Sequence, residues 1–458
     1  MGFESLSPSL KYRQPTDSCQ LAVYTFLWLP RDPSSERRKT PLLISPSPGR
    51  DVPPGGGQAW AGSGGELGKA MRELFHDNRR LLVFVILSNF LLNFGFQVWQ
   101  TLFNNFAVEE LGAGPAAVGL IQAVREVPGL LGFVLAFVAL YVSELRIMSL
   151  SIILMGVGVV LSGQATGVPF LVFATLLMSV GFHFFYPSSN AVVLMAMKQE
   201  DTPKTLGNLG SLGSLASVAG TGLVLLLAAW ASYRAMFTGV GALVIAGGLL
   251  LLLFRGPQGC LPTGRRVRLR RRYWLYYTLS FLLGSRRHIF TTFAVFLLVR
   301  EHHVPIQMTA LLFLVNSIIN VFTLRLTGQW VGRLGERTAM TITFSSLALI
   351  FLGYAYITAL PVLFGLFILD NIFFGFNVAL STYFQKIAVT REEITSNLST
   401  EQAIQHIAAI TVPLIGGTVW ELFGARAPFL FGVGIVLGGL ILAQRMRVAS
   451  VPAVAGGE

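Results

Sequence analysis

The feature that most constrains this chain is a series of long apolar runs, separated by short polar breaks, that begins near residue 79 and continues almost to residue 445. A helix of about 20 apolar residues crosses the hydrocarbon core of a bilayer. Lipid offers no hydrogen-bonding partner to an open backbone, so these runs are expected to be helical. Only 12% of the 458 residues are charged, whereas soluble domains carry about 25%. We therefore predict an all-α membrane protein whose main partner is the lipid bilayer.

Twelve spanning helices are expected, in two groups of six. They lie near residues 79–104, 115–140, 147–166, 168–197, 207–231, 235–254, 273–299, 306–331, 338–357, 361–386, 399–421 and 427–445. The predicted domains are residues 71–254, a basic linker at 255–272, residues 273–448 and a tail at 449–458. Residues 1–70 are rich in Pro, Gly and Ser and are interpreted as a disordered N-terminal extension, with translation from Met71 as an alternative.

Basic residues are concentrated in alternate loops, most densely between Arg265 and Arg272. Cytoplasmic loops of membrane proteins carry an excess of Lys and Arg, so this alternation places both termini in the cytoplasm. It also accounts for the net charge of +12 without nucleic acid, which is not expected as a partner. The predicted location is the plasma membrane, taken as a bacterial inner membrane.

The two halves repeat each other at an offset of about 190 residues: Pro115 matches Pro305, and the stretch from Gly207 matches the stretch from Ser396. The segment from Gly328 to Arg337 resembles a loop motif of the major facilitator superfamily, although Gly332 replaces the motif's acidic residue. This resemblance implies two pseudo-symmetric six-helix bundles, transport by alternating access and a monomer. It also implies a gating loop whose candidate residues are Gly328, Arg333, Gly335 and Arg337.

Polar side chains gather on one face of the first, fourth, seventh and tenth predicted helices, each within an arc of about 80° or less. Such stripes avoid lipid and face protein or water. The third, sixth, ninth and twelfth helices are almost entirely apolar, small or hydroxyl-bearing, and we expect them to face lipid. The predicted substrate cavity contains Asn93, Gln97, Gln100, His183, Tyr186, Asn190, Arg287, Thr291, Asp370 and Asn377.

Several ionisable residues are expected deep in the bilayer, where a charge needs a partner or water. Arg125, Glu126 and His406 are assigned to proton coupling or to pairing between the bundles. One hypothesis is that Glu126 contacts His406 across the seam, the boundary between the two bundles where the second and eleventh predicted helices lie. Arg287 is interpreted as a substrate contact. Asp370 is expected either to carry a coupling proton or to neutralise Arg287. His183 is expected either to take part in transport or to be a packing residue of its helix.

The sequence predicts a secondary transporter of a small polar or anionic solute, with proton coupling. The alternatives are a non-transporting sensor or assembly factor with the same fold, and a multidrug or metabolite efflux antiporter. No nucleophile–base pair, phosphate loop or metal-ligand spacing is present in the sequence, so no enzyme activity, cofactor or metal is expected. The two cysteines, Cys19 and Cys260, suggest no disulfide.

Overall fold

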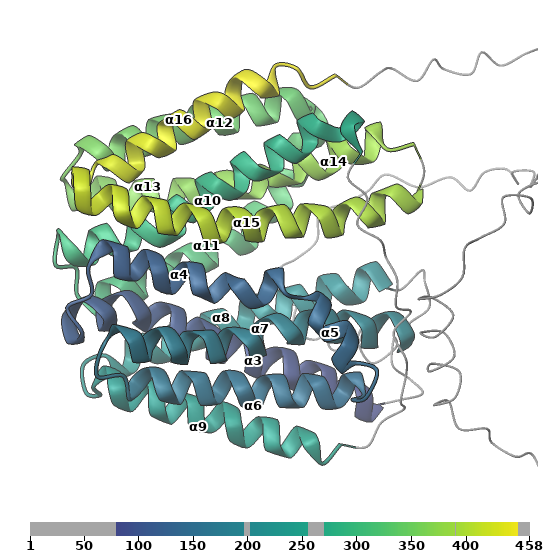
Figure 1. Cartoon of the computed structure of the whole chain (residues 1–458), viewed down its shortest axis with the longest axis vertical. Coiled ribbons are helices and arrows are strands. Elements are labelled where there is room, and N and C mark those ends of the chain that lie inside the picture. The colour runs from purple at the N-terminus through teal and green to yellow at the C-terminus, as the bar shows by residue number, and fades with distance from the viewer. Residues whose placement is uncertain (1–78, 197–201, 255–269, 390, 448–458) are drawn as a thin grey trace, which may run out of the picture. The chain divides into compact units, whose positions relative to one another are not determined.

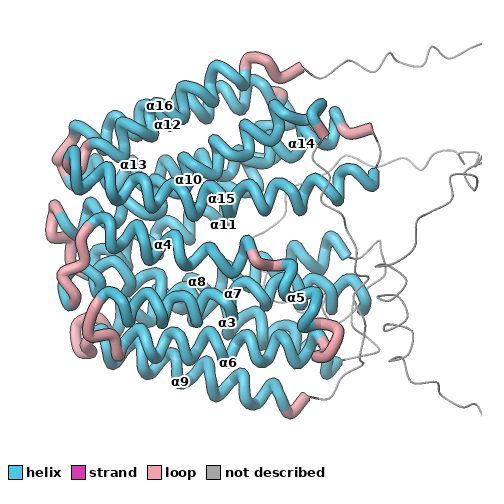
Figure 2. Tube along the Cα trace, in the orientation of Figure 1, coloured by secondary structure: helices cyan, strands magenta, loops and turns pink. Residues whose placement is uncertain are grey.

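The computed structural model describes residues 79–196, 202–254, 270–389 and 391–447. The predicted N-terminal extension at 1–70, most of the basic linker at 255–272 and the tail at 449–458 lie outside this range. Throughout the described residues the regular elements are helices, and Figure 2 shows them joined by short loops. Nine of these helices are long and apolar enough to cross a membrane.

The first group of helices follows the order of the predicted N-terminal bundle (Figure 1). Its elements are α3 (Arg79–Asn105), the π-helical turn η2 (Phe106–Glu110), α4 (Pro115–Leu130), α5 (Phe133–Val138), α6 (Glu144–Gly163), α7 (Val168–Ala196), α8 (Thr202–Leu227) and α9 (Tyr233–Leu252). Within this group α6 packs against both α7 and α9, and α3 packs against α8.

The second group makes up the C-terminal bundle, at the top of Figure 1. Its elements are the 3-10 turn η3 (Arg271–Tyr273), α10 (Trp274–Arg300), α11 (Ile306–Leu334), α12 (Glu336–Tyr356), α13 (Leu360–Phe374), the 3-10 turn η4 (Gly375–Asn377), α14 (Val378–Ile387), α15 (Arg391–Phe423) and α16 (Ala427–Ala443). Here α12 packs against α16, and α10 packs against α15.

Two of the predicted spans are interrupted. The span expected at 115–140 divides at Leu131 and Gly132 into α4 and α5. Pro128 lies inside α4 and cannot donate the usual helical hydrogen bond. The flanking Gly129 and Gly132 further weaken the helix there, since glycine is a poor helix former. The span expected at 361–386 likewise changes to a 3-10 turn at Gly375–Asn377.

The two bundles meet mainly along two pairs of helices, α4 with α15 and α8 with α11, and α3 and α4 make smaller contacts with α10 and α11. Gly417 of α15 lies so close to α4 that an added Cβ would be 2.7 Å from the Pro115 carbonyl oxygen and 2.9 Å from Ala116 Cα. Gly119 of α4 approaches the Pro413 carbonyl in the same way. Glycine therefore permits backbone-to-backbone packing between the bundles, as small residues do at membrane helix interfaces.

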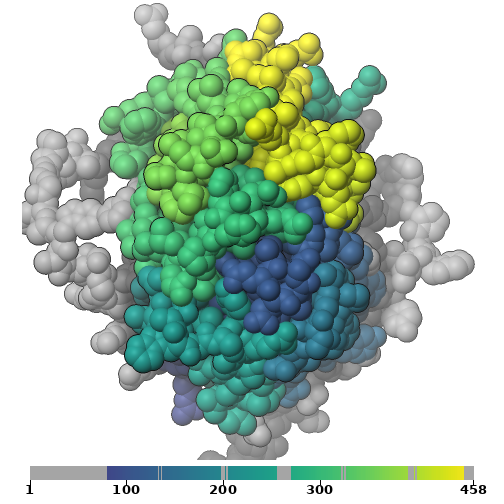
Figure 3. Space-filling model, turned by 90° about the vertical axis from the view of Figure 1, so that its left-hand side faces the viewer, coloured from purple at the N-terminus to yellow at the C-terminus, as the bar shows by residue number. Residues whose placement is uncertain are grey.

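Hydrogen bonds also join the two bundles at the end of the molecule where Gly417 contacts Pro115. Asn105 Nδ2 donates to the Val304 carbonyl at 2.9 Å, and an Arg300 guanidinium nitrogen donates to the Ala113 carbonyl at 3.1 Å. At the second seam, Gln307 Nε2 donates to the Ala228 carbonyl at 3.1 Å. Figure 3 looks onto this end and shows purple-blue segments of the first bundle packed directly against green segments of the second.

Candidate functional site

A cavity of about 1050 Å³ lies between the two bundles. Its lining comes from α3, α4, α7 and α8 on one side, and from α10, α11, α13, η4, α14 and α15 on the other. Among the described residues, α6, α9, α12 and α16 contribute nothing to this lining. The apolar third, sixth, ninth and twelfth predicted helices therefore lie away from the cavity, and the polar stripes lie on it.

Seven of the ten predicted cavity residues line this space. They are Gln97, Gln100, His183, Arg287, Thr291, Asp370 and Asn377. Asn93, Tyr186 and Asn190 do not line it. The Tyr186 hydroxyl donates to Asn93 Oδ1 at 2.8 Å, which holds α7 against α3, and Asn190 is exposed farther along α7. These three residues do not line the cavity as predicted, because the helical stripes extend beyond it.

Arg125 and Arg287 both line the cavity, and Arg125 is paired with Glu126, whereas Arg287 has no carboxylate partner among the described residues. The Arg287 guanidinium carbon lies 4.3 Å from the centroid of the Phe374 ring, a distance typical of a cation–π contact. Among the described residues, no carboxylate lies within ion-pair distance of it and no side chain hydrogen-bonds to it. An unpaired guanidinium in a low-dielectric cavity favours water or an anion as its partner.

The expected neutralisation of Arg287 by Asp370 is wrong. Asp370 instead pairs with Arg286, whose NH1 group lies 3.1 Å from both carboxylate oxygens. Arg286 is fully buried, and its Nε and NH2 groups have no hydrogen-bond partner. Neighbouring residues on a helix point about 100° apart, so one arginine faces the carboxylate while the other faces the cavity. The buried pair belongs entirely to the C-terminal bundle.

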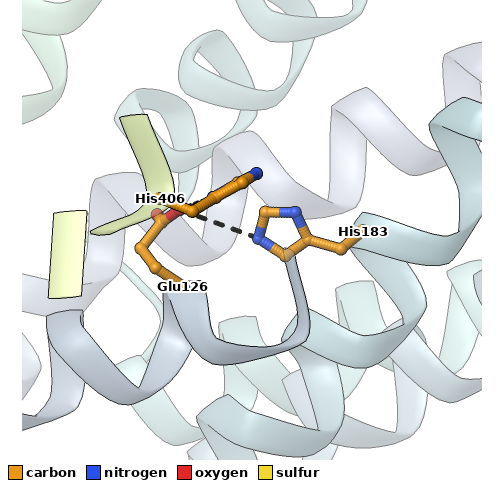
Figure 4. Close-up of side chains that lie close together, drawn as sticks. All are labelled: Glu126, His183 and His406. Atoms are coloured by element: carbon orange, nitrogen blue, oxygen red, sulfur yellow. Dashed lines mark hydrogen bonds and ion pairs between the residues drawn. The ribbon is translucent and has the colours of Figure 1, made fainter. Parts of the chain in front are cut away.

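Glu126 lies at the centre of a second cluster, where α4, α7 and α15 meet (Figure 4). Arg125 donates two hydrogen bonds to Glu126 Oε1, from Nε at 3.1 Å and from NH2 at 2.8 Å. On the other oxygen, Oε2, His406 Nδ1 approaches to 3.1 Å and His183 Nε2 to 3.9 Å. The expected meeting of Glu126 with His406 across the seam is thus observed, and its influence on pH dependence stays a prediction.

Local packing explains how the three helices reach this cluster. Ser179 of α7 donates a hydrogen bond to the Arg125 carbonyl, which ties α7 to α4 beside the carboxylate. At Gly129 an added Cβ would lie 2.7 Å from both nitrogens of the His406 ring. The absence of a side chain at Gly129 therefore allows His406 to reach α4.

Sequence reasoning missed several contributors to the cavity, among them His288, Gln405 and Phe374. His288 lies about one helical turn before Thr291, a predicted cavity residue, so the 3.6-residue period of the helix could have predicted it. Gln405 Nε2 donates to the Ser280 carbonyl at 3.3 Å. Phe374 gave no signal, because an aromatic residue on an apolar helix is ordinarily packing material.

The predicted gating loop is much shorter than expected. Gly328 and Arg333 lie on α11, and Gly335 alone separates α11 from α12, with a φ of +78° that favours glycine. Arg337 donates to Gln444 Oε1 at 3.1 Å, which links α12 to the end of α16. Glu336 pairs with Lys386 at 2.5 Å. These contacts join helices of one bundle. They form without the acidic residue of the motif, whose position is occupied by Gly332.

Comparisons with known proteins agree with this architecture. The nucleoside transporter NupG superposes with a TM-score of 0.65 at 15% identity, covering 80% of this chain and 99% of that one. A bacterial homologue of the human lysosomal transporter Spinster, in its inward-facing and unoccupied conformation, gives 0.64 at 14% identity, covering 81% and 98%. Its occupied form gives 0.65 at 16% identity, covering 80% and 97%. At these identities the likeness shows the fold alone.

No curated protein sequence matches this chain. The family model of the Major Facilitator Superfamily, in contrast, matches residues 85–400, which is well over half of the sequence. Together with the multi-pass helical fold and the cavity between the bundles, this match defines the family. The chain belongs to the Major Facilitator Superfamily of membrane transporters.

Proposed function

We propose that this protein is a secondary transporter that moves a small polar or anionic solute by alternating access. The observation that carries the proposal is Arg287, a cation without a carboxylate partner that faces a cavity between two helical bundles. An anionic group would satisfy its guanidinium, which presents donors in a fork that matches carboxylate and phosphate. Transporters of this superfamily bind substrates near the bilayer midplane, between their halves.

Amide side chains around Arg287 support a polar substrate. They come from both bundles and are Gln97, Gln100, Asn104, Gln122, Asn316, Asn320, Asn371, Asn377, Gln402 and Gln405. Each amide can both donate and accept hydrogen bonds. Asn316 and Asn377 both line the cavity, and their Oδ1 atoms are buried without a hydrogen-bond partner. A hydrophobic drug would leave these groups unsatisfied, which makes the efflux-antiporter alternative less favourable.

The conformation described above corresponds to one end of a transport cycle. Its closed end carries the connections between α3 and α4, between α10 and α11, and between α15 and α16. The basic-loop pattern assigns these connections to the outside of a bacterial plasma membrane and both termini to the cytoplasm. On that assignment the structure is inward-facing, and the contact between Glu126 and His406 pairs the bundles in this state. We propose that the monomer is the functional unit.

Proton coupling is assigned to Asp370. This carboxylate is buried, lines the cavity and is held by a single guanidinium nitrogen of Arg286. A two-nitrogen fork would hold the ionised form more firmly. A proton reaching Asp370 from the cavity would weaken the buried pair and alter the packing of α10 against α13. No ATP-binding motif is present in the sequence, so an ion gradient is the natural driving force.

A ligand screen tests the proposal. The purified protein is heated in the presence of organic anions, sugars, amino acids, nucleosides, siderophores and cationic drugs. A ligand at a hundredfold excess over its Kd stabilises the folded state by about 2.7 kcal/mol. We expect an anionic or polar class to raise the Tm, Arg287→Ala to remove the shift, and the exposed control Arg271→Ala to retain it. Stabilisation that survives Arg287→Ala would contradict the site.

Transport and coupling are separated in proteoliposomes loaded with that ligand. Asp370→Asn keeps an oxygen acceptor for Arg286 but cannot exchange a proton. We expect this variant to retain counterflow exchange and to lose accumulation driven by a pH gradient. If accumulation persists at the wild-type level, Asp370 is not the coupling residue. Binding without any counterflow in the wild-type protein would favour the sensor alternative.

A further inference from the structure

Glu126, His183 and His406 present three potential metal ligands at one point of the cavity wall. One ligand atom from each residue lies within 4.8 Å of the other two. The three residues come from α4, α7 and α15, and all of them line the cavity (Figure 4). Two imidazoles and one carboxylate are a common ligand set for Zn²⁺ in proteins.

Two of the three separations lie near the spacing of ligand atoms around a single ion. Glu126 Oε2 lies 3.1 Å from His406 Nδ1 and 3.9 Å from His183 Nε2. With the third separation at its limit of 4.8 Å, the three atoms lie on a circle with a radius of about 2.4 Å. Zinc binds nitrogen and oxygen at about 2.0–2.2 Å in a tetrahedron, whose ligand atoms are about 3.3–3.6 Å apart. The two imidazole nitrogens would therefore approach each other by about 1.2–1.5 Å, through rotation of their side chains, when the ion binds.

The surroundings leave the ligand atoms available. Arg125 occupies Oε1 of Glu126, so Oε2 remains for an ion. The cavity supplies an entry path and space for a water molecule as fourth ligand.

The charges nearby restrict which ion can bind. Arg125 and Arg287 are cationic, and His288 lines the same cavity, so a hard ion held only by electrostatic attraction is disfavoured. Zn²⁺ and its chemical neighbours bind imidazole strongly, whereas Mg²⁺ and Ca²⁺ prefer oxygen. The site therefore requires a metal with a high affinity for nitrogen.

We propose that Glu126, His183 and His406 bind one Zn²⁺-type ion and that this ion joins the two bundles. Glu126 and His183 belong to the N-terminal bundle, and His406 belongs to the C-terminal bundle. Coordination by all three holds α4 and α7 against α15, so the ion stabilises the conformation described here. This inference does not depend on the identity of the transported solute, since binding is measured without transport.

The test is a Zn²⁺ titration of the full-length protein in detergent, by calorimetry, after removal of any polyhistidine tag. We expect one saturable site whose affinity falls at least tenfold in His183→Gln and in His406→Gln. The amide of glutamine can still hydrogen-bond to Glu126 but is a poor zinc ligand. His302→Ala, in the turn between α10 and α11, serves as the matched control and is expected to bind as the wild type does.

A second measurement on the wild-type protein covers the case in which a variant fails to fold. Co²⁺ bound by nitrogen and oxygen ligands has a visible absorption band, which one equivalent of Zn²⁺ should remove. We also expect Zn²⁺, but not Mg²⁺, to raise the Tm of the wild type. A wild-type protein with no saturable Co²⁺ band, or folded glutamine variants with unchanged Zn²⁺ affinity, would overturn the proposal.

Discussion

Replacement of Gly417 by alanine is expected to shift the equilibrium between the two transport conformations. The new Cβ would lie 2.7 Å from the Pro115 carbonyl oxygen, about 0.7 Å short of an ordinary contact at 3.4 Å. This oxygen and the other obstructing atom, Ala116 Cα, belong to the backbone of α4, so a rotamer change cannot relieve the clash. Overpacking of this kind costs about 1–3 kcal/mol. Because Gly417 lies between bundles, that cost falls on the closed state alone and corresponds to a shift of about 5- to 150-fold.

Two matched glycines separate this effect from a general loss of stability. Gly241 of α9 is equally crowded, since an added Cβ would lie 2.8 Å from the Gly156 carbonyl oxygen, but this contact is inside one bundle. Gly241→Ala should therefore lower the Tm without favouring either conformation. Gly222 has no atom within 4 Å of an added Cβ, so Gly222→Ala should not lower the Tm and should favour neither conformation.

The assay is a distance measurement between spin labels at the closed end. Trp230 and Phe423 are 89% and 74% exposed and accept labels as cysteines once Cys19 and Cys260 are replaced by serine. We expect a second, longer distance in Gly417→Ala and a single distance in the other two variants. An unchanged distribution in Gly417→Ala, together with an unchanged Tm, would refute the close packing of α4 on α15. An equal loss of stability in Gly417→Ala and Gly241→Ala, with no new distance, would refute the two-body description.

Three further substitutions test individual contacts by thermal unfolding. Arg286→Leu should destabilise the protein by about 3–5 kcal/mol, because it leaves Asp370 buried without its partner, and Arg286→Leu combined with Asp370→Leu should recover most of that loss. Tyr186→Phe removes the hydrogen bond to α3 and should cost about 0.5–1.5 kcal/mol. Lys386→Ala should cost less than about 1 kcal/mol despite its 2.5 Å ion pair, because the Lys386 side chain is 51% exposed.

The positions of the helices, and which of them line the cavity, could be predicted from the sequence. The apolar runs indicate the helices, and the polar side chains that repeat at the helical period indicate the face toward the cavity. Gln97 and Gln100 of α3 and Arg287 and Thr291 of α10 line the cavity as their stripes indicate. The break in α4 was less visible, although Pro128 and the neighbouring glycines contain its cause. A hydropathy run ignores such a break, since Leu130 and Leu131 continue the apolar stretch on both sides.

The partners of the ionisable residues were harder to predict, because they depend on how each helix is rotated. Arg286 and Arg287 are equivalent in sequence, and a rotation of about 100° exchanges their roles. The Glu126 cluster has a different difficulty. Metal-ligand motifs are recognised by short spacings, whereas these three ligands are brought together by the crossing of α4, α7 and α15. The expectation that no metal binds rested on spacing within single segments, which cannot detect a site of this kind.

The distribution of ion pairs has a consequence for how the bundles separate. Arg125 and Glu126 share α4, and Arg286 and Asp370 both belong to the C-terminal bundle. Among the charged pairs of the described residues, only the contact of His406 with Glu126 joins the two bundles. If the bundles part as rigid bodies, Glu126 keeps its arginine, and the cost at this cluster is one hydrogen bond to a charged group, about 1.5–3 kcal/mol. Separation of a buried ion pair would cost about 3–5 kcal/mol. The cavity can thus open between the bundles without separating an arginine from its carboxylate, which is a condition that alternating access requires.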